Sequence, residues 1–232
     1  MRLLVSVTTA DEIIAALAGG ADLLDLKNPA EGSLGAPPPA LIRVARRLAP
    51  ATVPVSAALG DFPPLPGSAA LAAVGAAQTG AHYVKIGLLA PPPMAFAVAR
   101  AVRTALDEFA PHARLILATY ADTTSEEAVS VAALPRLAAE AGADGCLIDT
   151  LHKDGRTLHE HLAPAVLEAY VRQCHDHDLS AALAGALQAD DLPALAALGT
   201  DLVGVRGAAC QGGRTGHLDP LLVRALKNRL PD

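Results

Sequence analysis

The sequence contains little cysteine, and the few residues present do not fit a disulfide framework. Among 232 residues there are three cysteines, Cys146, Cys174 and Cys210. Their number is odd and their spacing is not that of a metal-binding motif, so we interpret them as reduced structural thiols. This interpretation predicts a cytoplasmic protein.

The chain also lacks a cluster of basic residues. Its formal net charge at pH 7 is -6, and an acidic protein without a basic patch is not typical of nucleic-acid binding. We therefore exclude nucleic acid as the partner and expect a small-molecule substrate. A local phosphate site remains compatible with this overall charge.

No long hydrophobic run is present. The initial segment MRLLVSVTTADE has one basic residue and returns to polar residues after a few apolar positions, which is too short for a signal peptide or a membrane span. Later apolar stretches are broken by glycine, proline or charge, so we expect no membrane association. Because 52% of the residues are hydrophobic, the chain can bury a full core, and we expect residues 1–232 to form one catalytic domain.

What the sequence does contain is a regular alternation of two kinds of segment. Short runs typical of β-strands occur at 3–7, 23–27, 53–59, 82–88, 114–120, 145–150, 179–184 and 202–206. Alanine- and leucine-rich segments with helical spacing lie between them, for example at 11–18, 40–48, 95–109, 165–175 and 193–198. No dinucleotide-binding fingerprint accompanies them. The alternation therefore predicts an α/β protein with the closed (β/α)8 architecture of a TIM barrel rather than an open doubly wound sheet.

A closed barrel places several charged side chains on its inner face. Successive side chains of a strand alternate between two faces, so Asp25 and Lys27 point the same way while Leu24 and Leu26 face the helices. The same alternation turns three further residues inward on later even-numbered strands: Lys85, Asp149 and Arg206. All of them lie near the carboxyl ends of their strands, where barrel enzymes hold their active sites.

Two lysines and two aspartates in one barrel interior favour a chemical role over a structural one. A single inward lysine is often part of a structural ion pair, but packed like charges are destabilising unless they are used. A lysine near a second cation and an apolar wall has a lowered pKa, and its neutral amine can attack a carbonyl group. We therefore expect Schiff-base chemistry at Lys27, with Lys85 as an electrostatic and proton-transferring partner.

Glycine-rich loops after the last two predicted strands indicate a phosphate site. In many barrels these loops and a helix N-terminus bind phosphate through backbone N–H groups. We expect the site to be formed by Gly185, Arg206, Gly207, Gly212 and Gly213, and we expect Ser33, between two glycines, to serve a second phosphate. A bulky residue in place of Gly185 is expected to weaken substrate binding more than folding.

The motifs themselves resemble those of the (5-formylfuran-3-yl)methyl phosphate synthase family over essentially the whole chain. The resemblance is carried by DLKNPAEGSLGA from Asp25, VSAALGD from Val55, YVKIGL from Tyr83, IDTLHKDGRTLHEHL from Ile148, ALAG from Ala182 and DLVGVRGAAC from Asp201. It implies that two molecules of glyceraldehyde 3-phosphate condense to 4-(hydroxymethyl)-2-furancarboxaldehyde phosphate, with loss of phosphate and water, for methanofuran-type cofactor biosynthesis.

The resemblance also implies roles for particular residues. Lys27 matches the family's Schiff-base lysine, and four other polar site positions are matched by Asp25, Lys85, Asp149 and Lys153. We expect no cofactor and no metal, because the histidines lack a convincing ligand arrangement. The expected partner is a phosphorylated triose, and a homo-oligomer is compatible with the sequence. Two alternatives stay open: a class I aldolase acting on another sugar phosphate, and a barrel that binds a sugar phosphate without turnover.

Overall fold

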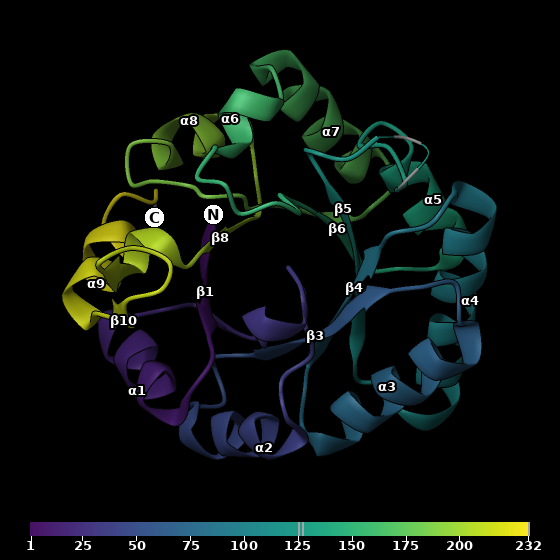
Figure 1. The fold of residues 1–232 in the computed structure, drawn as a ribbon, viewed down its shortest axis with the longest axis horizontal. Helices are drawn as coiled ribbons and strands as arrows, with labels where there is room; N and C mark the ends of the chain where they lie inside the picture. Colours follow the sequence, from purple (N-terminus) through teal and green to yellow (C-terminus); the bar gives the residue numbers. More distant parts are fainter. Residues whose placement is uncertain (125, 127, 232) are drawn as a thin grey trace.

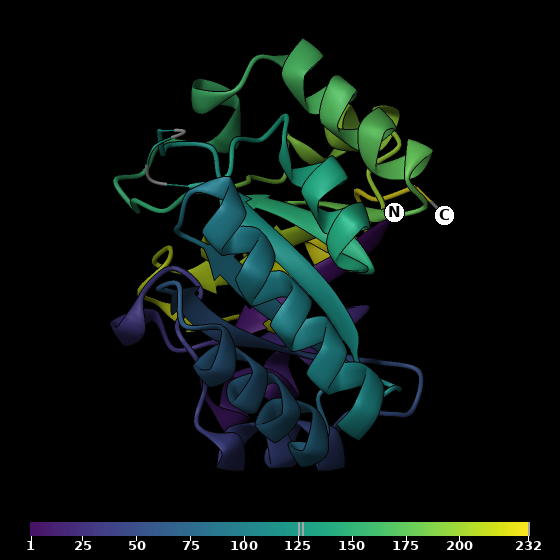
Figure 2. The same ribbon diagram turned by 90° about the vertical axis from the view of Figure 1, so that its right-hand side faces the viewer.

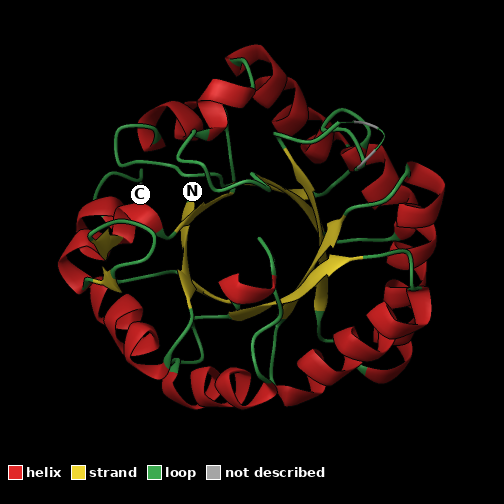
Figure 3. Ribbon diagram, in the orientation of Figure 1, coloured by secondary structure: helices red, strands yellow, loops and turns green. Residues whose placement is uncertain are grey.

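The structure is a closed barrel of parallel strands surrounded by helices, which confirms the predicted fold. The computed structural model describes residues 1–124, 126 and 128–231, and within them strands β1 to β8 pair in sequence order around the barrel. Figures 1 and 3 show the ring of strands seen down the barrel and the outer layer of helices. The strands are β1 (Arg2–Val7), β2 (Leu23–Leu26), β3 (Val55–Phe62), β4 (Tyr83–Leu88), β5 (Arg114–Tyr120), β6 (Gly145–Asp149), β7 (Ser180–Leu183) and β8 (Leu202–Val205).

The helices cover the outside of the barrel, and several begin at a proline. Proline fixes the φ angle that the first helical turn needs and lacks only an N–H group that would be unpaired there. The helices are α1 (Ala10–Gly19), α2 (Pro39–Leu48), α3 (Pro66–Thr79), α4 (Pro92–Phe109), α5 (Leu134–Ala141), α6 (Leu158–His161), α7 (Pro164–Asp176), α8 (Leu192–Ala197) and α9 (Pro220–Lys227). None of the described helices is long and apolar enough to cross a membrane.

The termini and the loop after β8 complete the ring. Figures 1 and 2 both show the N-terminus near the C-terminal end of the described chain. After β8 the chain makes a short 3-10 turn, η2 (Gly207–Ala209), and a small antiparallel ribbon of β9 (Cys210–Gln211) and β10 (His217–Leu218). This ribbon leads into α9, which packs against α1 and so closes the helical layer between the two ends of the chain.

The alternation of side chains along the strands separates two cores. Leu24, Leu26 and Ile86 are fully buried between the strands and the helices. The barrel interior has its own apolar cluster, whose members include Leu4, Leu23, Leu34, Ala58, Ile116, Ala118, Tyr120, Leu147 and Leu202. Asp25 and Lys85 lie on this inner face beyond the apolar cluster, as the sequence parity predicted, and both side chains are buried.

One loop lies across the mouth of the barrel. Residues 28–35, which we call the plug, connect β2 to α2 and contain the short 3-10 helix η1 (Pro29–Glu31). Figure 3 shows this turn projected onto the centre of the strand ring. Leu34 enters the apolar cluster inside the barrel and is completely buried. The plug therefore fills part of the barrel mouth and leaves the remaining part open.

Candidate active site

The open part of the barrel mouth is a cavity of about 280 Å³. Its walls come from the carboxyl ends of β1, β2, β4, β6, β7 and β8 and from the loops that follow them. Most of the residues expected from the sequence line it, namely Asp25, Lys27, Lys85, Asp149, Lys153, Gly185, Arg206, Gly207 and Gly213. Further lining residues are Ser6, Thr150, His152 and Arg214. The cavity wall thus combines these polar side chains with three apolar residues of the interior cluster, Leu4, Leu147 and Leu202, and with glycine-rich loops.

Lys85 forms a buried ion pair at the base of the cavity. Its Nζ lies 2.6 Å from Oδ1 of Asp25, and both side chains are almost fully buried. The hydroxyl of Ser6 donates to the other carboxylate oxygen, Oδ2, at 3.1 Å. An ion pair in this environment holds both partners in place, because removing either would leave an uncompensated buried charge. Asp25 therefore holds the Lys85 side chain in the cavity that Lys27 also lines.

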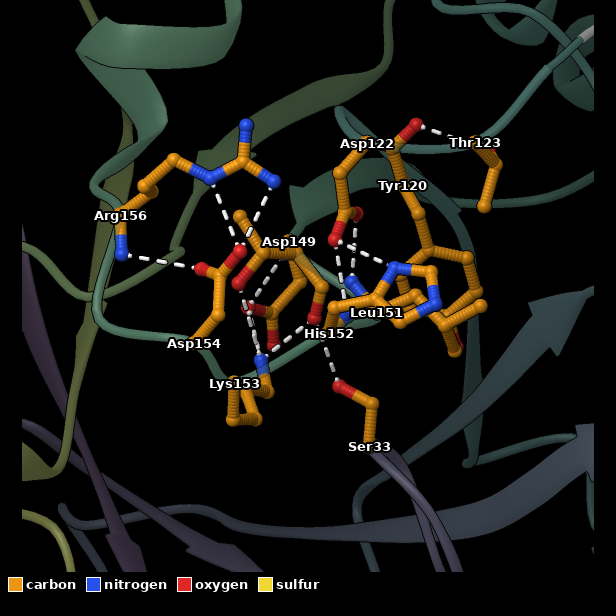
Figure 4. Close-up of polar contacts among 11 residues, drawn as sticks. Ser33, Tyr120, Asp122, Thr123, Asp149, Leu151, His152, Lys153, Asp154 and Arg156 are labelled. Atoms are coloured by element: carbon orange, nitrogen blue, oxygen red, sulfur yellow. Dashed lines mark hydrogen bonds and ion pairs between the residues drawn. The ribbon is translucent and has the colours of Figure 1, made fainter.

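A second lysine–carboxylate pair stands at the end of β6. Nζ of Lys153 lies 2.9 Å from Oδ1 of Asp149 and also donates to the carbonyl of Thr150. The backbone N–H of Thr150 donates to the same carboxylate oxygen at 2.8 Å. Figure 4 shows the Lys153 ammonium among these oxygens. Burial alone would raise the pKa of Asp149, but the positive charges of Lys153 and Lys27 outweigh it and lower the pKa to about 2.

Lys27 differs from both of these lysines because its ammonium has no ion-pair or hydrogen-bond partner among the described residues. Its residue exposure is 5%, and burial lowers the pKa of Lys27 to about 8. Asp149 and Asp25 act against this shift, whereas Lys85 and Lys153 add to it. The cluster contains three lysines and two aspartates, so the positive charges outnumber the negative ones and one amine loses its proton more easily than usual. Lys27 is the amine best placed to do so.

Arg206 is already bound by an acid. Its Nη1 and Nη2 contact the two carboxylate oxygens of Glu12 at 2.9 Å and 3.0 Å, and Nη1 also donates to the carbonyl of Ser6 at 3.2 Å. Burial would raise the pKa of Glu12, but the hydrogen bond from Arg206 and its charge lower it. The Arg206 guanidinium therefore forms a neutralised wall of the cavity instead of a free anion-binding group.

Arg214 carries a guanidinium group that is available to bind an anion. It lines the cavity and is half-buried, and its side chain has no hydrogen-bond or ion-pair partner within the described part of the chain. Burial lowers the pKa of Arg214, Asp149 raises it and Arg206 lowers it, with a net lowering. Our sequence analysis did not include Arg214 among the site residues. The signal was its position directly after the Gly212–Gly213 pair.

The phosphate-loop residues are only partly brought together. Gly185, Gly207 and Gly213 line the cavity, whereas Gly212 does not and turns the chain beside it with φ of +80°. Gly185 has φ of +112°, and a Cβ there would lie 3.0 Å from Cγ2 of Thr150. A bulky residue at Gly185 would therefore also strain the backbone, so we expect a cost to folding beside the predicted loss of substrate binding.

Ser33 does not line the cavity. Its hydroxyl is buried and donates to the carbonyl of Thr150 at 3.0 Å, the carbonyl that also accepts from Lys153. Figure 4 shows Ser33 approaching this carbonyl from the plug. This hydrogen bond holds the plug against the end of β6, and it occupies the Ser33 hydroxyl that we expected to serve a second phosphate.

The structure shows two further hydrogen-bonded pairs, each with an aspartate, that the sequence analysis did not predict. The hydroxyl of Tyr120, at the end of β5, donates to Oδ1 of Asp61 from β3. Nδ1 of His152 lies 3.1 Å from Oδ2 of Asp122, whose carboxylate also accepts from the backbone N–H groups of Leu151 and His152. Among residues 1–124, 126 and 128–231, no group of three or more His, Cys, Asp or Glu side chains is arranged to hold a metal ion.

Fold and cavity together define a (β/α)8-barrel enzyme with a buried lysine–carboxylate centre. Solved structures with the same fold include a KGPDC from Streptococcus mutans, with a TM-score of 0.69 at 16% identity over 98% of this chain and 96% of that chain. A 3-hexulose-6-phosphate synthase aligns with a TM-score of 0.67 at 16% identity over 100% of both chains. At these identities the similarity shows the fold alone.

Sequence comparison identifies the family. The family model described as 4-HFC-P synthase matches residues 3–227. The (5-formylfuran-3-yl)methyl phosphate synthase of Methanocaldococcus jannaschii is 42% identical over 98% of this chain and 98% of its own. That of Methanothermobacter thermautotrophicus is 43% identical over 99% of both. A bacterial relative, the putative synthase of Streptomyces griseus, is 44% identical over 98% of this chain and 93% of its own. The chain belongs to the (5-formylfuran-3-yl)methyl phosphate synthase family.

Proposed function

We propose that the enzyme condenses two molecules of glyceraldehyde 3-phosphate into 4-(hydroxymethyl)-2-furancarboxaldehyde phosphate through a Schiff base on Lys27. The product would serve the synthesis of a methanofuran-type cofactor. The observation that carries this proposal is the Lys27 amine, which is buried in the cavity, unpaired among the described residues and lowered in pKa to about 8. Family membership supports the same reaction, since the product is the compound in the relatives' name.

The cluster around Lys27 supplies what the chemistry requires. The neutral amine attacks the carbonyl carbon of one triose phosphate and water leaves, which produces an iminium. The iminium withdraws electrons and acidifies the adjacent carbon, so that a base can convert it into an enamine. Asp149, held ionised by Lys153, is positioned to accept protons, whereas Lys85 and Lys153 can stabilise developing oxyanions and donate protons to leaving oxygens.

A phosphate group of the substrate fits the glycine-rich side of the cavity. Gly207 and Gly213 allow the backbone to approach an anion closely, and Arg214 adds a positive charge whose side chain has no hydrogen-bond or ion-pair partner among the described residues. Arg206 helps to fix the shape of this loop. Its Nε donates a hydrogen bond to the backbone carbonyl of Arg214 at 3.1 Å. We thus propose that the phosphate contacts Arg214 directly and that Arg206 shapes the loop.

Replacing Arg214 is expected to weaken substrate binding. In Arg214→Gln, KM for glyceraldehyde 3-phosphate should rise roughly ten- to a hundredfold, because one charge-assisted contact with phosphate is lost. The exposed Arg136, on α5 and paired with Glu140, provides the control variant Arg136→Gln, which should leave KM unchanged. Steady-state kinetics of both variants measure the difference. An unchanged KM in Arg214→Gln would show that the phosphate binds elsewhere.

The reaction itself is tested with the purified enzyme and glyceraldehyde 3-phosphate as the only substrate. Consumption of the triose should accompany the ultraviolet absorption of a furan aldehyde and release of phosphate. An open-chain product without furan absorption would indicate an aldolase instead. Tight binding of the triose phosphate without any product would indicate a barrel that only binds it.

A further inference from the structure

The plug is closed on itself and spans the barrel mouth. The N–H of Asn28 donates to the carbonyl of Gly35 at 2.8 Å, and its side chain accepts from the N–H of Ala30 at 3.2 Å. A Cβ on Gly35 would lie 2.1 Å from the Asn28 carbonyl, so this closure requires glycine. The plug leaves β2 and reaches β6, on the opposite side of the ring, where Ser33 donates to the Thr150 carbonyl.

Asp61 and Tyr120 hold the plug from the side away from the cavity. Oδ2 of Asp61 accepts from the N–H of Leu34 at 3.3 Å, while Oδ1 accepts from the Tyr120 hydroxyl. Tyr120 is almost fully buried and packs in the same interior cluster as Leu34. The described residues of β3 and β5, which carry this pair, do not line the cavity. The pair thus touches the plug and not the space in which substrate would sit.

The surroundings are shaped to fit this pair. A Cβ on Gly87 would lie 2.3 Å from the Tyr120 hydroxyl oxygen and 2.4 Å from Oδ1 of Asp61. A Cβ on Gly32, whose φ is +127°, would lie 2.5 Å from Oδ2 of Asp61. None of these three oxygens could occupy its place if the neighbouring glycine carried a side chain. Two glycines on separate segments, β4 and the plug, therefore make room for one carboxylate and one phenol.

We propose that Asp61 and Tyr120 are positioning residues that lock the plug into the barrel mouth and thereby keep Lys27, the residue directly before the plug, in a water-poor wall of the cavity. This inference rests on the proposed role of Lys27 and deepens it. The pair acts through the plug: it excludes water from the amine and leaves the chemical steps to the lysines and Asp149.

Loosening the plug should change the protonation of Lys27. Burial is the largest cause of its lowered pKa, so admitting water should raise that pKa toward its ordinary value. The charged groups that face Lys27 stay in place: Asp25 on β2, Lys85 on β4, and Asp149 and Lys153 at the end of β6. Burial, together with the facing carboxylates of Asp61, Asp149 and Asp122, raises the pKa of Tyr120 well above its ordinary value and keeps the hydroxyl a hydrogen-bond donor.

The test compares Tyr120→Phe with Tyr83→Phe. Both changes remove one phenolic oxygen from a tyrosine whose ring packs at the barrel interior, but Tyr83 lies at the opposite end, near Arg2 and Ser180. In Tyr120→Phe we expect amide hydrogen exchange of residues 28–35 to accelerate roughly tenfold or more. We also expect the midpoint of the pH–rate profile for furan formation to rise by about one pH unit, with an about tenfold lower rate at pH 7 that recovers at high pH. Tyr83→Phe should match the parent enzyme in all three readouts.

The Lys27 pKa is also measured without turnover, by the pH dependence of its acylation with an amine-selective ester, read from peptide masses. This measurement of the Lys27 pKa does not depend on whether the proposed reaction is correct. Ser33→Ala removes the hydrogen bond that attaches the plug to the Thr150 carbonyl. It should also accelerate the amide exchange of residues 28–35 and raise the pKa of Lys27, and it replaces Tyr120→Phe if that variant does not fold. The proposal is overturned if Tyr120→Phe exchanges like Tyr83→Phe, or if exchange accelerates while the pKa of Lys27 does not move.

Discussion

Lys27→Arg should fold into the same barrel and lose furan formation almost completely. Arginine keeps a positive charge among Asp25, Lys85 and Asp149, but its guanidinium stays protonated at every working pH and cannot attack a carbonyl. We expect the rate to fall by roughly a thousandfold or more, as for removal of other covalent nucleophiles. The measurement is the ultraviolet absorption of the furan aldehyde, with circular dichroism to verify the fold.

Lys227→Arg is the matched control for this result. Lys227 is a partly exposed lysine on α9, in the outer helical layer, where it pairs with Asp22 at 2.6 Å. It does not line the cavity, and the exchange should leave the rate unchanged. Lys85→Arg should give an intermediate result, with slowed turnover, because its proposed role needs the positive charge more than a neutral amine. If Lys27→Arg retained a tenth or more of the parent rate, Lys27 would not be the nucleophile.

Lys27→Met should make the protein more stable at neutral pH. The pKa of Lys27 is about 8 in the folded protein, whereas an unfolded lysine has a pKa of about 10.4. Burying this amine therefore costs about 3 kcal/mol of folding free energy below pH 8. Methionine has a similar length and no charge, and its introduction leaves the two aspartates balanced by Lys85 and Lys153. We expect the free energy of unfolding at pH 7 to increase by about 3 kcal/mol.

The stability difference between Lys27→Met and the parent protein should depend on pH, and the two pKa values of Lys27 determine the direction. Between pH 8 and about pH 10.4 the unfolded chain binds more protons at this position than the folded one, so the stability of the parent protein rises with pH across that window. Lys27→Met lacks this contribution, and the difference between the two proteins should shrink to near zero above the window. Urea unfolding at several pH values measures it. A variant that is less stable than the parent at pH 7 would show that Lys27 is a stabilising ion-pair partner.

The sequence predicted the barrel and the inner charges because both follow from local rules. Strand-like runs and helical spacing are visible within short windows, and the period of two along a strand determines which side chains turn inward. Asp25, Lys27, Lys85 and Asp149 follow this rule. Lys153 lies beyond the end of β6, and its place beside Asp149 is predicted by the family motif and by the short separation along the chain.

The parts that could not be predicted depend on contacts between distant segments. Arg206 faces the cavity as expected, but its charge is neutralised by Glu12 from α1, and no local pattern couples the two. Asp61 reaches the plug because β3 continues past Gly60, where φ is +123° and the strand register shifts. The predicted strand ended at residue 59. Ser33 is drawn to the Thr150 carbonyl by a contact across 117 positions of the chain.

The central claim, that Lys27 forms a covalent iminium with a triose phosphate, is tested most directly by trapping. Borohydride added to the enzyme during turnover of glyceraldehyde 3-phosphate reduces an iminium to a stable amine and stops the reaction. Peptide mass analysis should then find the added triose-derived mass on the peptide that contains Lys27, in the parent enzyme and in Lys85→Arg, and should find no adduct in Lys27→Arg. An adduct on Lys85 or Lys153, or continued turnover without any adduct, would contradict the account.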